Sequence, residues 1–224
     1  LDRSSISREQ FSRAKQFLFR LAHILDREDE ICLYTFDDKD AYLELDFTKD
    51  RIPFLEALRN LDVTNTRTGR ILRELMGATP KTGLGIDMAL YRLRRGSNSK
   101  RAVLLRSNRF KGLGPATVEH VEESGYTLLT LSFNNKLNWI VTLGGDQMSK
   151  DRMMSQSGGR KFSSNEEDIT GVCREIASSL KNHYSLANST EVGTGRQKKR
   201  KVEERLPGHS NTNHSRRAYH PPPE

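Results

Sequence analysis

Hydrophobic residues recur every three to four positions in four stretches of the chain. In residues 8–25 and 166–180, apolar side chains form one stripe along a helix, and charged side chains lie on the opposite face. Residues 83–95 and 115–123 show the same period, and Pro115 stands at the start of the latter, where a helix tolerates proline. The pattern predicts four amphipathic helices, each of which packs by one face against another part of the fold.

Short runs rich in strand-forming residues alternate with these helices. Residues 31–36 are nearly continuously apolar, which is typical of a strand covered on both faces. Residues 102–105 and 126–133 predict two further strands. Residues 42–47 alternate apolar and polar side chains, as a sheet-edge strand with one wet face does. The polar residues 37–40 separate this segment from the strand before it. We therefore expect the first two strands to form a hairpin.

Further segments complete the predicted architecture. Thr48 is placed to cap a helix that ends at Leu61, with Pro53 in its first turn. Residues 147–157 predict a short helix that ends at two glycines, and residues 161–162 a brief strand. Strands that alternate with helices indicate a mostly parallel sheet with helices on both faces. The expected fold class is thus an α/β three-layer sandwich, Rossmann-like, with one antiparallel edge strand.

The composition changes after residue 180. Residues 1–180 carry the α/β pattern, and residues 181–205 predict a small β appendage in which 183–186 pairs with 199–202. Residues 206–224 are rich in Pro, His, Asn, Ser and Arg and offer little to bury, so we expect an extended basic tail.

Hydropathy and cysteine content exclude two kinds of structure, and charge indicates where a nucleic acid could bind. No apolar run approaches the length of a membrane-spanning helix, and two cysteines exclude a disulfide scaffold. The formal net charge is +8, of which +5 falls in residues 181–224, with nine Lys or Arg and four Asp or Glu. The basic excess therefore lies mostly in the tail. A nucleic acid could bind there, through Lys198, Lys199, Arg200 and Lys201.

Polar residues stand where three predicted loops should meet. Because ligand sites of open α/β sheets form at the carboxyl ends of the strands, we expect residues 2–7, Thr82, Ser107 and Asn108 to converge there. These residues resemble the von Willebrand factor A domain. In that family an Asp-x-Ser-x-Ser motif, a distant Thr and a distant Asp bind Mg²⁺ or Mn²⁺, and an acidic side chain of a protein partner completes the site.

The resemblance covers residues 1–180, and the residues after 180 indicate a subgroup of the family. Residues 183–186, 200–202 and 216–221 are similar to the closing segments of the bacterial von Willebrand factor A-related domain first described from Acidobacteria. The resemblance implies a larger, exported bacterial protein and hence an extracytoplasmic location.

This sequence departs from the family at its metal site. The second serine of the motif falls on Ile6, and the distant Asp falls on Ser107. Of the metal ligands, Asp2, Ser4 and Thr82 remain, and one of these is charged. Since affinity for a hard dication depends on the number of charged ligands, we expect a degenerate site with no bound cofactor. A shift in loop register would let Ser5 or Ser7 substitute.

A second departure concerns the sheet. In the family an apolar strand immediately precedes the Asp of the motif and sits in the middle of the sheet, whereas Leu1 alone stands there in this sequence. Either the sequence is cut from a longer chain, or the sheet lacks its middle strand and would be badly destabilised. Of the two, we expect the first core strand to lie upstream.

These observations favour an interaction domain over an enzyme. No Ser-His-Asp or Cys-His arrangement is visible, and the glycines before residue 86 lack the spacing of a P-loop. We expect a non-enzymatic, adhesion-type domain that binds a protein partner through its carboxyl-end rim. The alternative is a nucleic-acid-associated domain of the same type, which would use the basic tail. The residues expected to bind the protein partner are Asp2, Ser4, Ser5, Thr82, Ser107 and Asn108.

Overall fold

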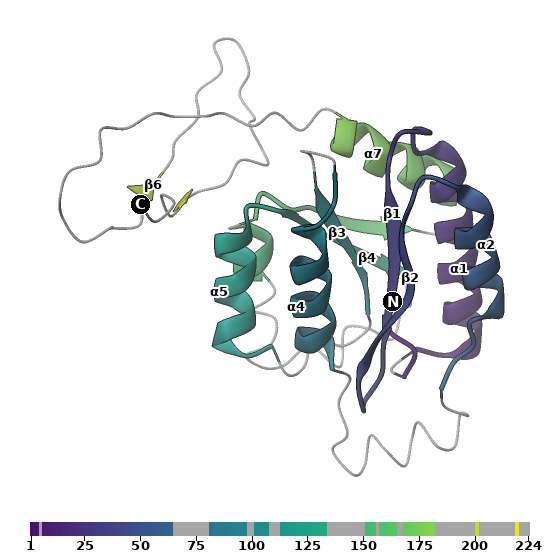
Figure 1. The fold of residues 1–224 in the computed structure, drawn as a ribbon, viewed down its shortest axis with the longest axis horizontal. Helices are drawn as coiled ribbons and strands as arrows, with labels where there is room; N and C mark the ends of the chain where they lie inside the picture. Colours follow the sequence, from purple (N-terminus) through teal and green to yellow (C-terminus); the bar gives the residue numbers. More distant parts are fainter. Residues whose placement is uncertain are drawn as a thin grey trace.

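The computed structural model describes most of the first 181 residues and two short strands beyond them. The described residues are 1–4, 6–64, 81–97, 101–107, 113–133, 151–155, 157–164, 168–181, 200–201 and 218–219. Within them a β-sheet lies between two layers of helices (Figure 1). The predicted three-layer α/β sandwich is thus confirmed.

The strands fall into a hairpin and a parallel sheet. β1 (Ile31–Phe36) and β2 (Ala41–Thr48) pair antiparallel, as the polar turn between them predicts. β3 (Ala102–Arg106), β4 (Thr127–Phe133) and β5 (Lys161–Ser164) pair parallel in the order β3-β4-β5. The parallel connections run through helices, as in other α/β folds.

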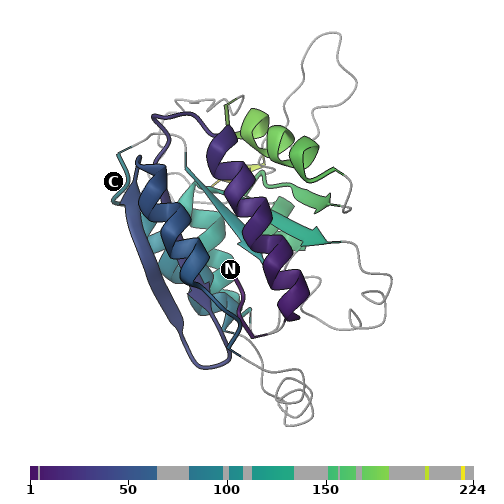
Figure 2. The same cartoon turned by 90° about the vertical axis from the view of Figure 1, so that its right-hand side faces the viewer.

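Helices cover both faces of the sheet and create two apolar cores. α1 (Arg8–Ile24), α2 (Arg51–Asn60) and α7 (Ile169–Lys181) lie on one face, and α4 (Thr82–Leu93) and α5 (Pro115–Ser124) lie on the other (Figures 1 and 2). The first core contains Phe17, Leu129 and Ile176, and the second contains Ile86, Val121 and Leu128. The leucines at 128 and 129 alternate between the two faces of β4, as pleating requires.

Helix ends differ from the predictions in one instructive place. Asp50, rather than Thr48, caps α2: its carboxylate accepts from the Ile52 N–H at 2.9 Å. Thr48 ends β2, and its hydroxyl oxygen accepts from the Asp50 N–H at 3.0 Å. The helix thus begins later than expected, and Pro53 still falls in its first turn.

Leu1 and Asp2 occupy the middle of the sheet. The Leu1 amino group donates to the Tyr34 carbonyl at 2.8 Å, and the Leu1 carbonyl accepts from the Phe36 N–H at 3.0 Å. On the other side, the Asp2 N–H donates to the Arg106 carbonyl at 2.9 Å. These two residues therefore connect β1 to β3 as a very short central strand.

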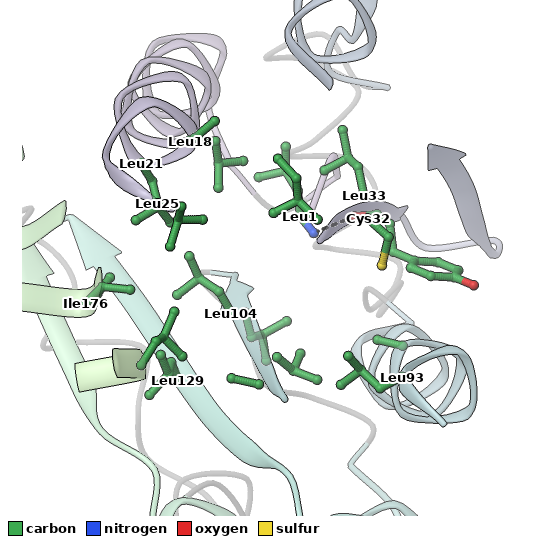
Figure 3. Close-up of a pocket in the computed structure, with 18 of the residues that line it drawn as sticks. Leu1, Leu18, Leu21, Leu25, Cys32, Leu33, Leu93, Leu104, Leu129 and Ile176 are labelled. Atoms are coloured by element: carbon green, nitrogen blue, oxygen red, sulfur yellow. Dashed lines mark hydrogen bonds between the residues drawn. The ribbon is translucent and has the colours of Figure 1, made fainter. Parts of the chain in front are cut away.

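A cavity of about 450 Å³ opens beside Leu1 (Figure 3). It lies between β1 and β3, and its walls include Leu18, Leu33, Leu93, Leu104 and Ile176. Burial at its end lowers the pKa of the Leu1 amino group from 8.0 to about 5, although the Asp2 carboxylate opposes this shift.

The last two strands lie in the part of the chain predicted as appendage and tail. β6 (Arg200–Lys201) pairs antiparallel with β7 (Ala218–Tyr219). The strand predicted at 199–202 is therefore partly present, but its observed partner comes from the segment expected to be an extended tail. The proposed partner, residues 183–186, lies outside the described residues.

Candidate functional site at the carboxyl-end rim

Asp2 is held at the carboxyl ends of β1 and β3 by backbone bonds on both sides. It forms a parallel bridge with Phe36, and its N–H bonds to the last residue of β3. The residue is fully buried, with 0% of its surface exposed. A carboxylate buried to this degree needs hydrogen-bond donors or a cation close by.

Two serines supply donors to the Asp2 carboxylate. Its Oδ1 accepts from the Ser4 backbone N–H at 2.9 Å and from the Ser4 hydroxyl at 3.3 Å. Its Oδ2 accepts from the Ser107 hydroxyl at 2.7 Å. The predicted convergence of residues 2, 4 and 107 is therefore present, and both carboxylate oxygens accept from uncharged donors.

Thr82 starts α4 at the same rim. The N–H of its neighbour Lys81 donates to the Asp37 carbonyl at 2.6 Å, and Asp37 directly follows Phe36, the bridge partner of Asp2. Thr82 is also fully buried. All four described site residues are thus buried, with exposures of 0% for Asp2, 8% for Ser4, 0% for Thr82 and 3% for Ser107.

Ile6, which stands at the second serine position of the motif, and its neighbour Ser7 both have structural roles. Ile6 is 3% exposed and belongs to the core beneath α1. Ser7 caps α1: its hydroxyl accepts from the Gln10 N–H at 3.2 Å, and the Gln10 side chain accepts from the Ser7 N–H at 3.1 Å. Ser7 is the serine that a register shift would bring to the site, and both its hydroxyl and its N–H already bond within this capping box.

Sequence reasoning missed Arg106, the residue before Ser107. Arg106 ends β3, is 2% exposed and has its guanidinium 4.9 Å from the centroid of the Phe133 ring. Burial lowers the pKa of Arg106 to about 10, and the charge of Asp2 works against this shift. The sequence did contain a signal for this residue: Arg106 is a basic residue at the end of an apolar strand, directly before the site residue Ser107.

Exposed residues surround these buried ones. The turn after β1 is fixed by Asp37, whose carboxylate accepts from the N–H of Lys39 at 2.8 Å and of Asp40 at 3.0 Å. Lys39 and Lys81, which both bond to Asp37 through their backbones, are exposed. Leu84 and Tyr42, each 39% exposed, flank them on α4 and β2. We call Lys39, Tyr42, Lys81 and Leu84 the rim surface.

Several predicted site residues cannot be placed. Ser5, Asn108, Lys198 and Lys199 lie outside the described residues. Arg200 and Lys201 form β6. Among the residues that the structure describes, no three His, Cys, Asp or Glu side chains gather into a group that could hold a metal ion. Those same residues also contain no helix long and apolar enough to cross a membrane.

Comparison with solved structures shows what the fold resembles. An aerotolerance-related membrane protein of Bacteroides fragilis aligns with a TM-score of 0.58 at 15% identity, over 81% of this chain and 96% of that one. The von Willebrand factor domain of the type V pili tip protein Mfa5 of Porphyromonas gingivalis aligns with a TM-score of 0.54 at 12% identity, over 85% and 96%. The SpRpn10 VWA domain aligns with a TM-score of 0.52 at 14% identity, over 76% of this chain and 89% of that one.

Sequence comparison points to the same family. No curated protein matches the chain. The family model of the von Willebrand factor type A domain matches residues 1–107, which include Asp2, Ser4, Thr82 and Ser107. This match, together with the shared fold, supports a von Willebrand factor A domain in this chain.

Proposed function

We propose that this domain recognises a protein partner at its carboxyl-end rim and that recognition needs no metal ion. The observation that carries the proposal is the Asp2 carboxylate, whose two oxygens accept hydrogen bonds from Ser4 and Ser107. These bonds join the loop of residues 2–7 to the end of β3 through uncharged donors. The rim is then a preformed surface, and preformed surfaces bind at low conformational cost.

The side chains at the rim do not suit Mg²⁺ or Mn²⁺. Hard dications prefer several oxygen ligands and more than one carboxylate. Asp2 contributes the single carboxylate among the retained motif residues, and Ile6 turns an aliphatic side chain into the core. Arg106 also places a buried positive charge that interacts with Asp2. We infer that Arg106 takes the electrostatic role that a dication would have beside this carboxylate.

The partner would contact the rim surface rather than the buried site residues. Lys39 and Lys81 offer two ammonium groups, and Tyr42 and Leu84 offer apolar area beside them. This combination fits an acidic side chain flanked by apolar ones. Asp2, Ser4, Thr82 and Ser107 would act indirectly, because they hold the backbone that carries the rim surface.

We also propose a non-enzymatic role in a larger extracytoplasmic protein. Folds of this kind occur in an aerotolerance-related membrane protein and in a pili tip protein. The buried Asp2 carboxylate, whose two oxygens already accept hydrogen bonds, is poorly suited to act as a base, since a general base must lie within hydrogen-bond reach of the substrate proton.

Selection of peptides from a random display library tests the proposal. The domain is immobilised and the selection is run once in EDTA and once in Mg²⁺. We expect acidic peptides with neighbouring apolar residues, enriched equally in both buffers. The charge reversals Lys39→Glu and Lys81→Glu should each reduce binding at least tenfold. Lys161→Glu, an exposed lysine at the start of β5, is the matched control and should bind as the wild type does.

Two results would contradict the proposal. Enrichment that requires Mg²⁺ would show that the rim works through a metal after all. Peptides that bind Lys39→Glu and Lys81→Glu as well as they bind the wild type would place recognition elsewhere on the domain.

A further inference from the structure

A groove runs along the outer face of α1, which lies between α2 and α7 on this side of the molecule (Figure 2). Its volume is about 760 Å³, and its lining residues come from all three helices. It shares no lining residue with the cavity beside Leu1 and contains no residue of the rim surface. We call it the α1 groove.

The face of α1 that lines the groove is opposite to the face that packs into the core. Phe11, Phe17 and Leu21 lie in the core. The lining residues recur at intervals of three and four positions from Ser12 to Ile24, which places them on a single face of the helix. Because an α-helix rises about 1.5 Å per residue, this face is about 18 Å long.

Positive charges lie on both sides of the groove. The Lys15 ammonium group donates to two backbone carbonyls at the end of α2, at 2.8 and 2.9 Å, so it reaches the α2 side. The Arg20 guanidinium donates to the Thr170 hydroxyl at 3.1 Å and so reaches the α7 side. Arg59 of α2 and Arg174 of α7 add an exposed guanidinium to each flanking helix.

These four cations have no described carboxylate to neutralise them. Among the described residues that line the groove there is no Asp or Glu. In the described part of the chain, none of the four forms an ion pair, whereas other surface arginines do, such as Arg13 with Glu9 and Arg160 with Glu175. The charge of the groove therefore favours an anionic partner.

Apolar side chains lie between the cations. Phe19 is 43% exposed, and its ring centroid lies 4.7 Å from that of His23. Ile24 and Leu55 are half-buried, and Leu58 is buried beneath them. A partner that carried charge alone would leave this apolar area in water. The groove therefore suits a partner that is apolar along its middle and acidic along both borders.

We propose that the α1 groove binds an acidic amphipathic helix of a protein partner. Its apolar stripe would lie against Phe19 and Leu55, and the carboxylates on both borders of the stripe would face the cations of the two walls. A helix bound in a groove uses apolar side chains at positions i, i+3, i+4 and i+7. A length of about 18 Å accommodates about three turns of such a helix.

Other anionic partners match the groove less well. A flat anionic bilayer would reach Phe19 and the cations but not the half-buried Ile24 and Leu55. The phosphates of a nucleic acid would pair with the cations and leave the apolar area without a partner. A second copy of the chain offers α5, which exposes Glu119 and Glu123, but none of the large exposed apolar residues in the described part of the chain lies on α5.

A designed peptide tests the proposal. It consists of two repeats of Glu-Leu-Glu-Gln-Leu-Leu-Gln, which places Leu on one helical stripe and Glu on both borders of that stripe. A second peptide has the same composition in an order that distributes Leu around the helix, and a third has Lys in place of Glu. Fluorescence anisotropy measures the binding of each labelled peptide to the full chain. We expect the first peptide to bind at least tenfold more tightly than the other two.

Substitutions in the groove should abolish this preference. Arg20→Glu and Arg174→Glu should each weaken binding of the first peptide at least tenfold, and so should Phe19→Ala. Arg94→Glu, which makes the same charge change at an exposed position after α4, is the matched control and should bind as the wild type does. The double variant of Arg20→Glu and Arg174→Glu should prefer the lysine peptide to the glutamate peptide. Melting temperatures establish that each variant is folded.

Two results would overturn the proposal. Equal binding of the first and second peptides would mean that no helical stripe is recognised. Equal competition by a single-stranded oligonucleotide, or by phosphatidylserine vesicles, at the same charge concentration would mean that charge alone is recognised.

The groove and the rim surface are tested separately. Lys39→Glu and Lys81→Glu should bind the designed peptide as the wild type does, and Arg20→Glu should keep the binding proposed for the rim surface. If the designed peptide is lost with the two lysine variants and kept with Arg20→Glu, the groove proposal fails and the rim proposal stands. If the library selection finds no rim partner while Arg20→Glu loses the designed peptide, the groove proposal stands alone.

Discussion

The Ser107 hydroxyl donates to Oδ2 of Asp2 at 2.7 Å, across 105 positions of sequence, and both residues are buried. Removing this donor should destabilise the fold. We expect Ser107→Ala to lower the free energy of unfolding by about 1–3 kcal/mol, because a buried carboxylate oxygen loses a partner. Urea denaturation measures the change. Ser155→Ala, which removes a hydroxyl that bonds to the Arg152 carbonyl, is the control and should stay within about 0.5 kcal/mol.

A second carboxylate at position 107 should create a need for metal. Ser107→Asp places like charges next to each other in a buried site, so the variant should be less stable than the wild type in EDTA. Mg²⁺ should then restore stability, by about 2.7 kcal/mol at a hundred times its dissociation constant. The wild type should show no such response. A wild-type melting temperature that rises with Mg²⁺ as much as that of the variant would contradict the metal-free rim.

Arg106 should matter through its charge beside Asp2. Arg106→Met removes a buried positive charge that acts on the Asp2 carboxylate and should lower the free energy of unfolding by about 1–3 kcal/mol. Adding Asp2→Asn removes the stranded charge, so the double variant should lose less than the two single changes together.

Arg160→Met provides the comparison for Arg106. The Arg160 guanidinium also lies over a phenylalanine ring, 5.3 Å from the Phe162 centroid, but its ion pair with Glu175 is half-exposed. Exposed ion pairs contribute little, so this change should cost about 1 kcal/mol or less. Equal losses for both arginine variants in denaturation experiments would mean that Asp2 does not depend on Arg106.

Gly85 should resist substitution even though it lies within a helix. Alanine is normally favoured over glycine in helices by about 0.5–1 kcal/mol. A Cβ at Gly85 would stand 2.8 Å from Cδ1 of Phe36, so α4 would have to move away from β1. We expect Gly85→Ala to destabilise by about 1–3 kcal/mol, the cost of overpacking. Gly114→Ala, whose added carbon would meet nothing within 4 Å, should change stability by less than about 1 kcal/mol.

Local patterns predicted the elements well, since local physics determines them. The apolar stripes of α1 and α7 and the polar turn between β1 and β2 need no knowledge of the rest of the chain. The start of α2 was misplaced because Thr48 and Asp50 are both capping residues. Which of them caps depends on where β2 ends, and pairing with β1 decides that.

Long-range consequences were harder to predict. The resemblance brought Asp2, Ser4 and Ser107 together, but nothing in the sequence indicates that all of them are buried. Arg106 ends an apolar strand, where a basic residue usually reaches solvent. Its burial follows from the contact with Phe133 and the charge of Asp2, which lie 27 and 104 positions away.

The divided sheet has a consequence for how the molecule unfolds. The hairpin of β1 and β2 carries its own ladder, and β3 to β5 carry another, with Leu1 and Asp2 between them. Parts of a protein that share few backbone bonds open as separate cooperative units. The hairpin should therefore detach while the three-stranded half stays closed, and unfolding should pass through a half-open intermediate.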